Sequence, residues 1–350
     1  MARVDVTVRG GGIFGLACAF TLLRRGAKLR LVETTRIGVG SSGGLVGALA
    51  PHVPENWNPK KQFQLESLLM AQDFWADVAR IGGHDPGYLR SGRLQPLPDA
   101  RAVDNARARV TEAATLWQGR ATWSVIPTTG AAWEPISPTG LLIHDSLTAR
   151  LSPRAASHAL TQAIRAMGGE IVIGDAQNDG AVLWATGYQG LLELNTAFGK
   201  AVGAGVKGQS LSLRLPGLDP APLPQLFAGS LHIVPHGDGS IAIGSTSENT
   251  WDAPDSLDAQ SDDLLARARA ALPILARADI TDRRAGIRPR AKTRSPMLGP
   301  WPGRPGHFIA NGGFKIGFGM APKVAQVMAD LILTDDDSAI PPGFRVEANL

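Results

Sequence analysis

Residues 4–33 read VDVTVRGGGIFGLACAFTLLRRGAKLRLVE, and this stretch decides the fold. Valines alternate with polar residues up to Val8, which predicts a strand, and the apolar run after the glycines predicts a helix that ends at Arg25. Residues 28–33 predict a second strand. A strand, a glycine-rich turn, a helix and a second strand are the opening units of a nucleotide-binding α/β fold.

The glycine-rich turn matches the pattern GxGxxG, with Gly10, Gly12 and Gly15 at its three glycine positions. The first glycine permits a tight turn, the second lets backbone amides approach a pyrophosphate, and the third lets the helix pack closely. The pyrophosphate would lie at the positive N-terminal end of the helix. Glu33 ends the second strand about twenty residues further on, where a carboxylate can accept hydrogen bonds from a ribose. We therefore predict a bound dinucleotide.

Composition excludes several classes of protein. The chain has 350 residues, of which 44% are hydrophobic and 19% charged, so it can bury one large or two smaller cores and is not a disordered chain. Its one cysteine, Cys18, excludes an intramolecular disulfide, a cysteine-rich zinc site and an iron–sulfur cluster. No His, Asp and Glu spacing indicates a metal site. A formal net charge of +4 is too small to indicate nucleic-acid binding by itself.

The longest apolar stretch, residues 13–23, is too short to span a bilayer. Asp5 precedes it, at a position where a secretion signal would carry basic residues. These features predict a soluble, cytoplasmic protein. Later in the chain, periodicity predicts helices over 62–81, 99–118, 154–168, 262–275 and 323–333. The polar tail after Asp337 is predicted to be poorly ordered at its end.

Six further segments, widely separated along the chain, carry short motifs. They are SSGGLVGALAP at 41–51, ATG at 185–187, KGQ at 207–209, VPHGDGSIAIGST at 234–246, GIRP with PMLG within 286–299, and the segment that begins NGGFKIG within 311–322. In this order they resemble the D-amino acid oxidase superfamily of FAD enzymes, and within it the glycine oxidase and sarcosine oxidase branch.

The resemblance implies an α/β fold with two parts. An FAD-binding Rossmann-like domain of the glutathione reductase type is expected to be assembled from discontinuous segments, at residues 1–80, 140–205 and 285–350. A substrate domain of the α+β class with a mixed sheet is expected at residues 81–139 and 206–284. The interval between the expected strands at 170–173 and 181–185 is shorter than is usual in the family.

The resemblance also implies noncovalent FAD, since Cys18 on the first helix is badly placed for a covalent link. The residues expected to bind FAD lie in the glycine turn, at the end of the second strand and in the later motifs: Gly10, Gly11, Gly12, Ile13, Phe14, Gly15, Glu33, Thr34, Ser41, Ser42, Gly43, Gly47, Ala48, Thr186, Gly187, Gly312, Gly313, Phe314, Lys315, Ile316 and Gly317.

The activity implied is FAD-dependent oxidation of a small amine or amino acid, as in glycine oxidases that supply the thiazole branch of thiamine synthesis. A hydride leaves the α carbon, the imine is hydrolysed, and oxygen reoxidises the flavin with release of peroxide. Three alternatives stay open: a D-amino acid dehydrogenase that uses a quinone or a carrier protein, a tRNA-modifying carboxymethylaminomethyl-uridine oxidoreductase, and a flavin-binding protein without turnover. The tRNA reading is not favoured, because no basic patch is interleaved with aromatic residues.

Three residues are predicted to act on the substrate. Arg288 is expected to hold a substrate carboxylate through its planar, bidentate guanidinium. His232 stands where the family has a ligand-holding tyrosine and is expected to titrate near neutral pH. Lys315 corresponds to a second arginine of that site. Gly313 replaces the usual histidine of the closing segment, and five more basic residues surround Arg288: Arg283, Arg284, Arg290, Lys292 and Arg294.

Overall fold

The first predicted strand forms the middle of a six-stranded sheet in the computed structural model, which describes residues 4–350. The strand order is β15-β16-β9-β1-β2-β8. All neighbours are parallel except β15 and β16, which are antiparallel. The strands span Val6–Arg9 (β1), Leu29–Glu33 (β2), Glu170–Ile173 (β8), Ala181–Trp184 (β9), Met297–Pro300 (β15) and His307–Asn311 (β16). This is the predicted nucleotide-binding sheet.

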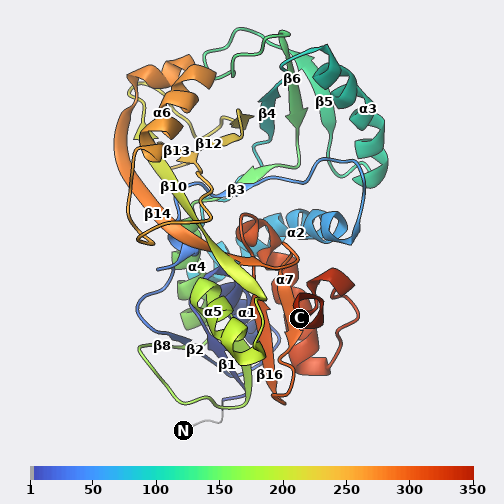
Figure 1. The fold of residues 1–350 in the computed structure, drawn as a ribbon, viewed down its shortest axis with the longest axis vertical. Helices are drawn as coiled ribbons and strands as arrows, with labels where there is room; N and C mark the ends of the chain where they lie inside the picture. Colours follow the sequence, from blue (N-terminus) through green and yellow to red (C-terminus); the bar gives the residue numbers. More distant parts are fainter. Residues whose placement is uncertain (1–3) are drawn as a thin grey trace.

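Helices flank this sheet in the lower half of the molecule (Figure 1). They span Ile13–Arg24 (α1), Pro59–Gly82 (α2), Pro153–Ala166 (α4), Gly187–Phe198 (α5) and Gly317–Thr334 (α7). The core they share with the sheet includes Val6 and Val8 from β1 and the apolar residues of α1, which are almost all fully buried. The helix α4 begins as the sequence predicts, because the Ser152 hydroxyl accepts a hydrogen bond from the Ala155 amide and Pro153 occupies the first turn.

A second, eight-stranded sheet forms the upper half of the molecule (Figure 1). Its order is β14-β10-β13-β12-β11-β4-β6-β5, and it is mixed, because β11 and β4 are parallel while the other pairs are antiparallel. Its strands span Arg93–Pro96 (β4), Trp123–Pro127 (β5), Leu141–Asp145 (β6), Gly203–Arg214 (β10), Gln225–Ala228 (β11), Leu231–Pro235 (β12), Ser240–Gly244 (β13) and Asp279–Ala291 (β14). Helices α3 (Ala100–Leu116) and α6 (Gln260–Ala271) pack on it.

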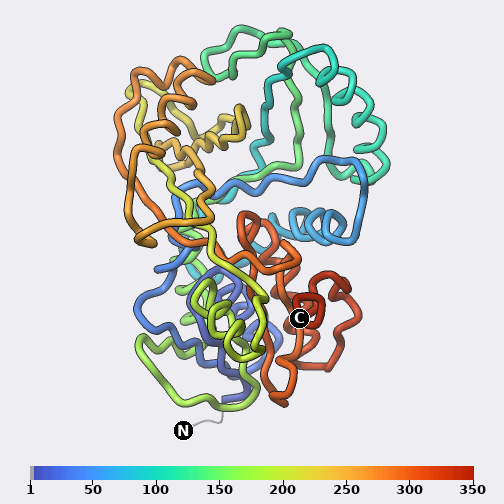
Figure 2. Tube along the Cα trace, viewed as in Figure 1, coloured from blue at the N-terminus to red at the C-terminus, as the bar shows by residue number. Residues whose placement is uncertain are grey.

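The two halves are joined by the long strands β10 and β14, which pair along their whole length. Figure 2 shows the chain passing between the halves along these strands. A two-stranded sheet of β3 (Ala48–Leu49) and β7 (Ala149–Arg150) lies between them. Three strands of the eight-stranded sheet, β6, β10 and β14, begin or continue within segments that the sequence-based division at residues 140, 205 and 285 assigns to the FAD-binding domain.

The C-terminal tail corrects one prediction. Residues beyond Asp337, predicted to be poorly ordered, turn back onto the six-stranded sheet through two short 3-10 helices, Pro342–Phe344 and Val346–Asn349. Phe344 is 1% exposed and its ring lies 4.9 Å from that of Phe63. The tail is polar on average, but Ile340, Phe344 and Val346 are buried. The last helix also begins earlier than predicted, at Gly317 instead of Lys323.

No helix within residues 4–350 combines the length and the apolar character needed to cross a membrane.

We expect Phe344→Ala to lower the free energy of unfolding by about 3–5 kcal/mol, because it removes a fully buried aromatic side chain and leaves a cavity. Chemical denaturation followed by tryptophan fluorescence measures this. The control is Ile136→Ala, which trims a side chain that is 57% exposed and should change stability by less than about 0.5 kcal/mol. Equal effects of the two substitutions would show that the tail does not contribute to the core.

Candidate active site

The glycine turn after β1 is shaped by close approach of backbone to backbone. Gly10 has φ +110°, and a Cβ there would lie 2.4 Å from the carbonyl oxygen of Ala185. A Cβ at Gly15 would lie 1.9 Å from the carbonyl oxygen of Gly10. Neither position can hold a side chain. The turn therefore brings the N-terminus of α1 against the end of β9, where Thr186 and Gly187 follow.

Backbone amides are free at the N-terminus of α1. Gly12 is the N-cap residue and gives no side-chain cap, and the Ile13 amide donates to the Ser42 hydroxyl at 2.9 Å. The amides of Gly12, Phe14 and Gly15 have no acceptor within residues 4–350. Free amides at the positive end of a helix bind anions such as a pyrophosphate.

Glu33 lies beside this turn, almost buried at the end of β2. One carboxylate oxygen accepts the Gly11 amide at 2.8 Å. The other accepts the Thr35 amide at 3.1 Å and the Thr34 hydroxyl at 3.2 Å. The carboxylate is thereby held in one orientation next to the turn, as the ribose role requires.

The later predicted segments gather around the same turn. Ser41–Gly43 form a 3-10 helix, Gly47 accepts the Leu151 amide through its carbonyl at 3.1 Å, and Asn311 donates to the Gly187 carbonyl at 2.9 Å. The closing segment links β16 to α7: the Phe314 amide donates to Pro289, and the Ile316 amide donates to Gly313. The helix α7 then starts at Gly317 with no side-chain cap.

A cavity of about 400 Å³ opens where these segments meet the eight-stranded sheet. Of the predicted FAD-binding residues, the following line it: Ile13, Ser41, Ser42, Gly47, Ala48, Phe314, Lys315 and Gly317. The others lie outside its wall: Gly10, Gly11, Gly12, Phe14, Gly15, Glu33, Thr34, Gly43, Thr186, Gly187, Gly312, Gly313 and Ile316. Arg288 and His232 face the same cavity from β14 and β12. The structure thus brings all three predicted substrate-site residues to one place.

Arg288 crosses β10 at Gly208, where a Cβ would lie 1.8 Å from its Nη2. Nη1 donates to the Ser245 hydroxyl at 2.7 Å, and Nη2 donates to the carbonyls of Lys207 at 2.9 Å and Thr246 at 2.6 Å. Nε is buried and has no partner within residues 4–350. Both bidentate edges of a guanidinium include Nη2, so the donors left in this arrangement are Nε–H and the second N–H of Nη1. Arg288 therefore does not present the bidentate pair of free N–H donors that the sequence predicts.

His232 packs on Phe227, with ring centroids 4.7 Å apart, and its Nδ1 has no partner within the described chain. Burial, followed by the nearby charges of Arg93 and Lys315, lowers the pKa of His232 to about 3. The expectation that this histidine titrates near neutral pH is therefore wrong. Desolvation and two cations keep the imidazole neutral, with one nitrogen able to donate and the other to accept.

The cavity carries positive charge. Arg284, Arg288 and Lys315 line it, and no Asp or Glu does so within residues 4–350. Desolvation and the charge of Arg288 lower the pKa of Lys315. Arg284 donates to the Val39 and Gly40 carbonyls at 2.8 and 3.0 Å. Other basic residues of this segment are engaged elsewhere, Arg283 with Asp262 and Arg290 with Asn249.

These features fit FAD. The open amides of α1 suit its pyrophosphate, and the fixed carboxylate of Glu33 suits a ribose. The cavity offers space for the cofactor where the later predicted segments meet the eight-stranded sheet. Cys18 is fully buried, and burial raises the pKa of its thiol, so it offers no thiolate for a covalent link. No cluster of three or more His, Cys, Asp or Glu in the described part of the chain could hold a metal ion.

Comparison with known proteins agrees with this geometry. The family described as FAD dependent oxidoreductase matches residues 5–331. The chain belongs to this family. It is thus an FAD-dependent oxidoreductase, and the predicted cofactor is confirmed at the level of the family.

The chain is similar to bifunctional ThiO/ThiG proteins and to glycine oxidases. It is 28% identical to the bifunctional protein ThiO/ThiG of Synechocystis sp. over 97% of this chain and 53% of that protein, so it spans about half the length of that relative. It is 26% identical to the glycine oxidase of Geobacillus kaustophilus over 94% of this chain and 93% of that enzyme. The crystal structure of glycine oxidase from the same organism superposes with a TM-score of 0.83, at 23% identity over 99% of both chains, which shows the shared fold.

The sequence did not single out several residues of this oxidoreductase's cavity wall. Phe227 and Ser230 lie in no motif, and only the pairing of β11 with β12 brings them to the cavity. Ser245 and Gly286 lie inside quoted motifs, so the motifs carried a signal for them. Arg284 is one of the five basic residues around Arg288 in the sequence, and its position at the cavity could not be deduced without the register of β14.

Replacing Glu33 with alanine should weaken FAD binding by about five- to a hundred-fold, since a hydrogen-bond acceptor is lost and the Gly11 amide loses its partner. Titration of the apoprotein with FAD, followed by flavin fluorescence, measures the dissociation constant. Unchanged affinity would show that Glu33 does not bind the ribose.

His232 should remain neutral from about pH 5 to 8, because its pKa lies near 3. His232→Ala is expected to change substrate preference while the shape of the pH profile of kcat/KM in this range stays that of the wild type. A histidine NMR titration checks the protonation state directly. A midpoint for His232 between pH 6 and 7 would contradict the structure.

Proposed function

We propose that this oxidoreductase oxidises the C–N bond of a small amine that carries a carboxylate, with glycine or an N-substituted glycine as the model substrate. The observation that carries the proposal is the cavity, in which loops of the FAD-binding half meet Arg288, His232 and Lys315. The similarity to glycine oxidase of Geobacillus kaustophilus supports the same substrate class.

The charge of the cavity selects an anion. Three cationic side chains line it without an acidic neighbour on the wall, so a bound carboxylate relieves their mutual repulsion. Arg288 offers the carboxylate its charge and the N–H of Nη1 that Ser245 leaves free, and Lys315 adds a second positive charge. This fixes one end of the substrate and orients its α carbon.

Uncharged side chains line the cavity beside its three cations. His232 is uncharged and half-buried, and Phe227 packs against it. The surrounding cations disfavour an ammonium and favour the neutral amine, which is the form that can lose a hydride. FAD held by the loops of the nucleotide-binding half would supply the acceptor for the hydride of the α carbon. Hydrolysis of the released imine yields an oxo acid and ammonia, or a primary amine from an N-substituted substrate.

We infer that oxygen is the electron acceptor and that peroxide is released, as the resemblance to glycine oxidases implies. The same resemblance supports a role in supplying the thiazole branch of thiamine synthesis. Purified holoenzyme is tested for peroxide with glycine, N-methylglycine and D-amino acids. Peroxide formation supports an oxidase, whereas flavin bleaching without peroxide would favour a dehydrogenase with a quinone or protein acceptor. No bleaching with any amine would overturn the proposal.

Arg288→Met should lower kcat/KM for a carboxylated amine by about ten- to several-hundred-fold, because it removes charge-assisted hydrogen bonds worth about 1.5–3 kcal/mol. Arg288→Lys keeps the charge and should fall between this variant and the wild type. Both should retain FAD. The control is an amine of similar size without a carboxylate, whose slower oxidation should hardly depend on Arg288. Equal losses for both substrates would make the arginine structural.

A further inference from the structure

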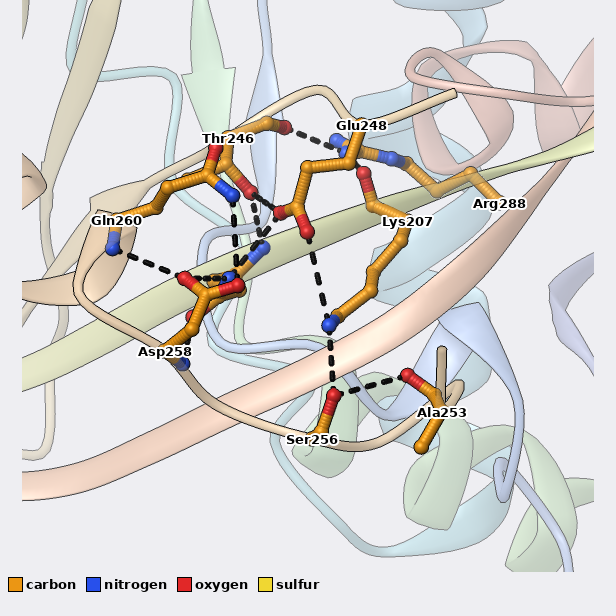
Figure 3. Close-up of polar contacts among 9 residues, drawn as sticks. Lys207, Thr246, Glu248, Ala253, Ser256, Asp258, Gln260 and Arg288 are labelled. Atoms are coloured by element: carbon orange, nitrogen blue, oxygen red, sulfur yellow. Dashed lines mark hydrogen bonds and ion pairs between the residues drawn. The ribbon is translucent and has the colours of Figure 1, made fainter. Parts of the chain in front are cut away.

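A polar cluster lies beside the Arg288 guanidinium at β10 (Figure 3). It joins β10 to the loop of residues 245–260 that follows β13. Its members are Lys207, Gln209, Thr246, Glu248, Ser256, Asp258 and Gln260, and none of them lines the cavity.

The two carbonyls that hold Nη2 of Arg288 both belong to this cluster. Lys207 and Glu248 form a short antiparallel bridge: the Lys207 amide donates to Glu248 at 2.9 Å, and the Glu248 amide donates to Lys207 at 3.0 Å. The Lys207 carbonyl therefore accepts from Glu248 and from Arg288 at once. The Thr246 carbonyl, the other acceptor, lies two residues before Glu248.

The Glu248 side chain ties the same two residues together. One carboxylate oxygen accepts hydrogen bonds from the Thr246 hydroxyl and, at 3.2 Å, from Gln209 Nε2. The other oxygen lies 3.6 Å from Lys207 Nζ. Both side chains of this ion pair are buried, 2% exposed for Lys207 and 8% for Glu248. Removing the carboxylate would break the contacts that Glu248 makes with Thr246 and Gln209 through one oxygen and with Lys207 through the other.

The Glu248 carboxylate places a negative charge close to Arg288. Burial lowers the pKa of Arg288 to about 10, and the negative charge of Glu248 opposes this change. The positive charges of Lys207 and Arg288 are matched in number by the carboxylates of Glu248, which is buried, and of Asp258, which is exposed.

We propose that Glu248 is the positioning residue of the site: by tying Thr246 and Lys207 together, its carboxylate places the two carbonyls that aim the guanidinium of Arg288 at the cavity. Glu248 touches neither substrate nor FAD and acts through Arg288. The consequence for turnover rests on the proposed function, but the orientation of Arg288 does not.

The first test is structural and does not depend on turnover. In a crystal structure of the Glu248→Gln holoenzyme, we expect the Arg288 guanidinium to have left at least one of the two carbonyls, because the amide group cannot balance Lys207. A guanidinium still bonded to both carbonyls would overturn the proposal. If this variant does not fold, Thr246→Val, which removes the hydroxyl that donates to Glu248, is tested in the same way.

The second test is a double-mutant cycle on binding of glycolate, a two-carbon hydroxy acid without a C–N bond, measured through the flavin absorbance. Glu248→Gln should weaken glycolate binding about ten-fold in the wild-type background and less than two-fold in the Arg288→Met background. Equal weakening in both backgrounds would show a merely structural role and overturn the proposal. Glu66→Gln is the matched control, because Glu66 pairs with Lys323 at 3.2 Å on helices α2 and α7, and it should leave binding unchanged.

The two proposals fail in different ways. Glycolate binding that is the same in wild type and Arg288→Met would remove Arg288 as the carboxylate anchor and so contradict the proposed function, while the crystal structure still decides what positions Arg288. Binding that depends on Arg288 but not on Glu248 would contradict only the positioning role.

Discussion

The antiparallel pairing of β10 with β14 is the constraint on which the site depends. The two strands run together from the nucleotide-binding half into the eight-stranded sheet, and their register sets Val206 opposite Arg288 and Gly208 opposite Gly286. Because Gly208 has no side chain, the Arg288 guanidinium can lie across β10 and reach the loop after β13. A shift of one residue would turn Arg288 to the other face of the sheet.

Charge is the second organising feature. The cavity wall is cationic, the buried carboxylate of Glu248 does not line it, and a histidine inside the cavity is kept neutral by its surroundings. These facts share one feature: several positive side chains lie close together and are at least partly desolvated. A site of this kind favours an anionic ligand and disfavours a second cation, as oxidation of a carboxylated amine in its neutral form requires.

Much of the FAD-binding half could be predicted because its signals are local. The glycines of the first turn, the alternating valines of β1 and the acid at the end of β2 lie within thirty residues and need only short-range geometry. The proline and serine at the start of α4 are equally local. The tail was predicted wrongly because burial of Phe344 depends on Phe63, which is distant in sequence.

By itself, the sequence determined the nucleotide-binding unit, the family resemblance and Arg288, His232 and Lys315 as candidates, since each follows from residue type and motif. Only the tertiary structure decided how these side chains are used. The pKa of His232 depends on Arg93 and Lys315, which approach it from other elements. The donors left on Arg288 depend on carbonyls of Lys207 and Thr246, and those depend on Glu248. Solvation and hydrogen-bond partners arise from residues distant in the chain, so no local pattern records them.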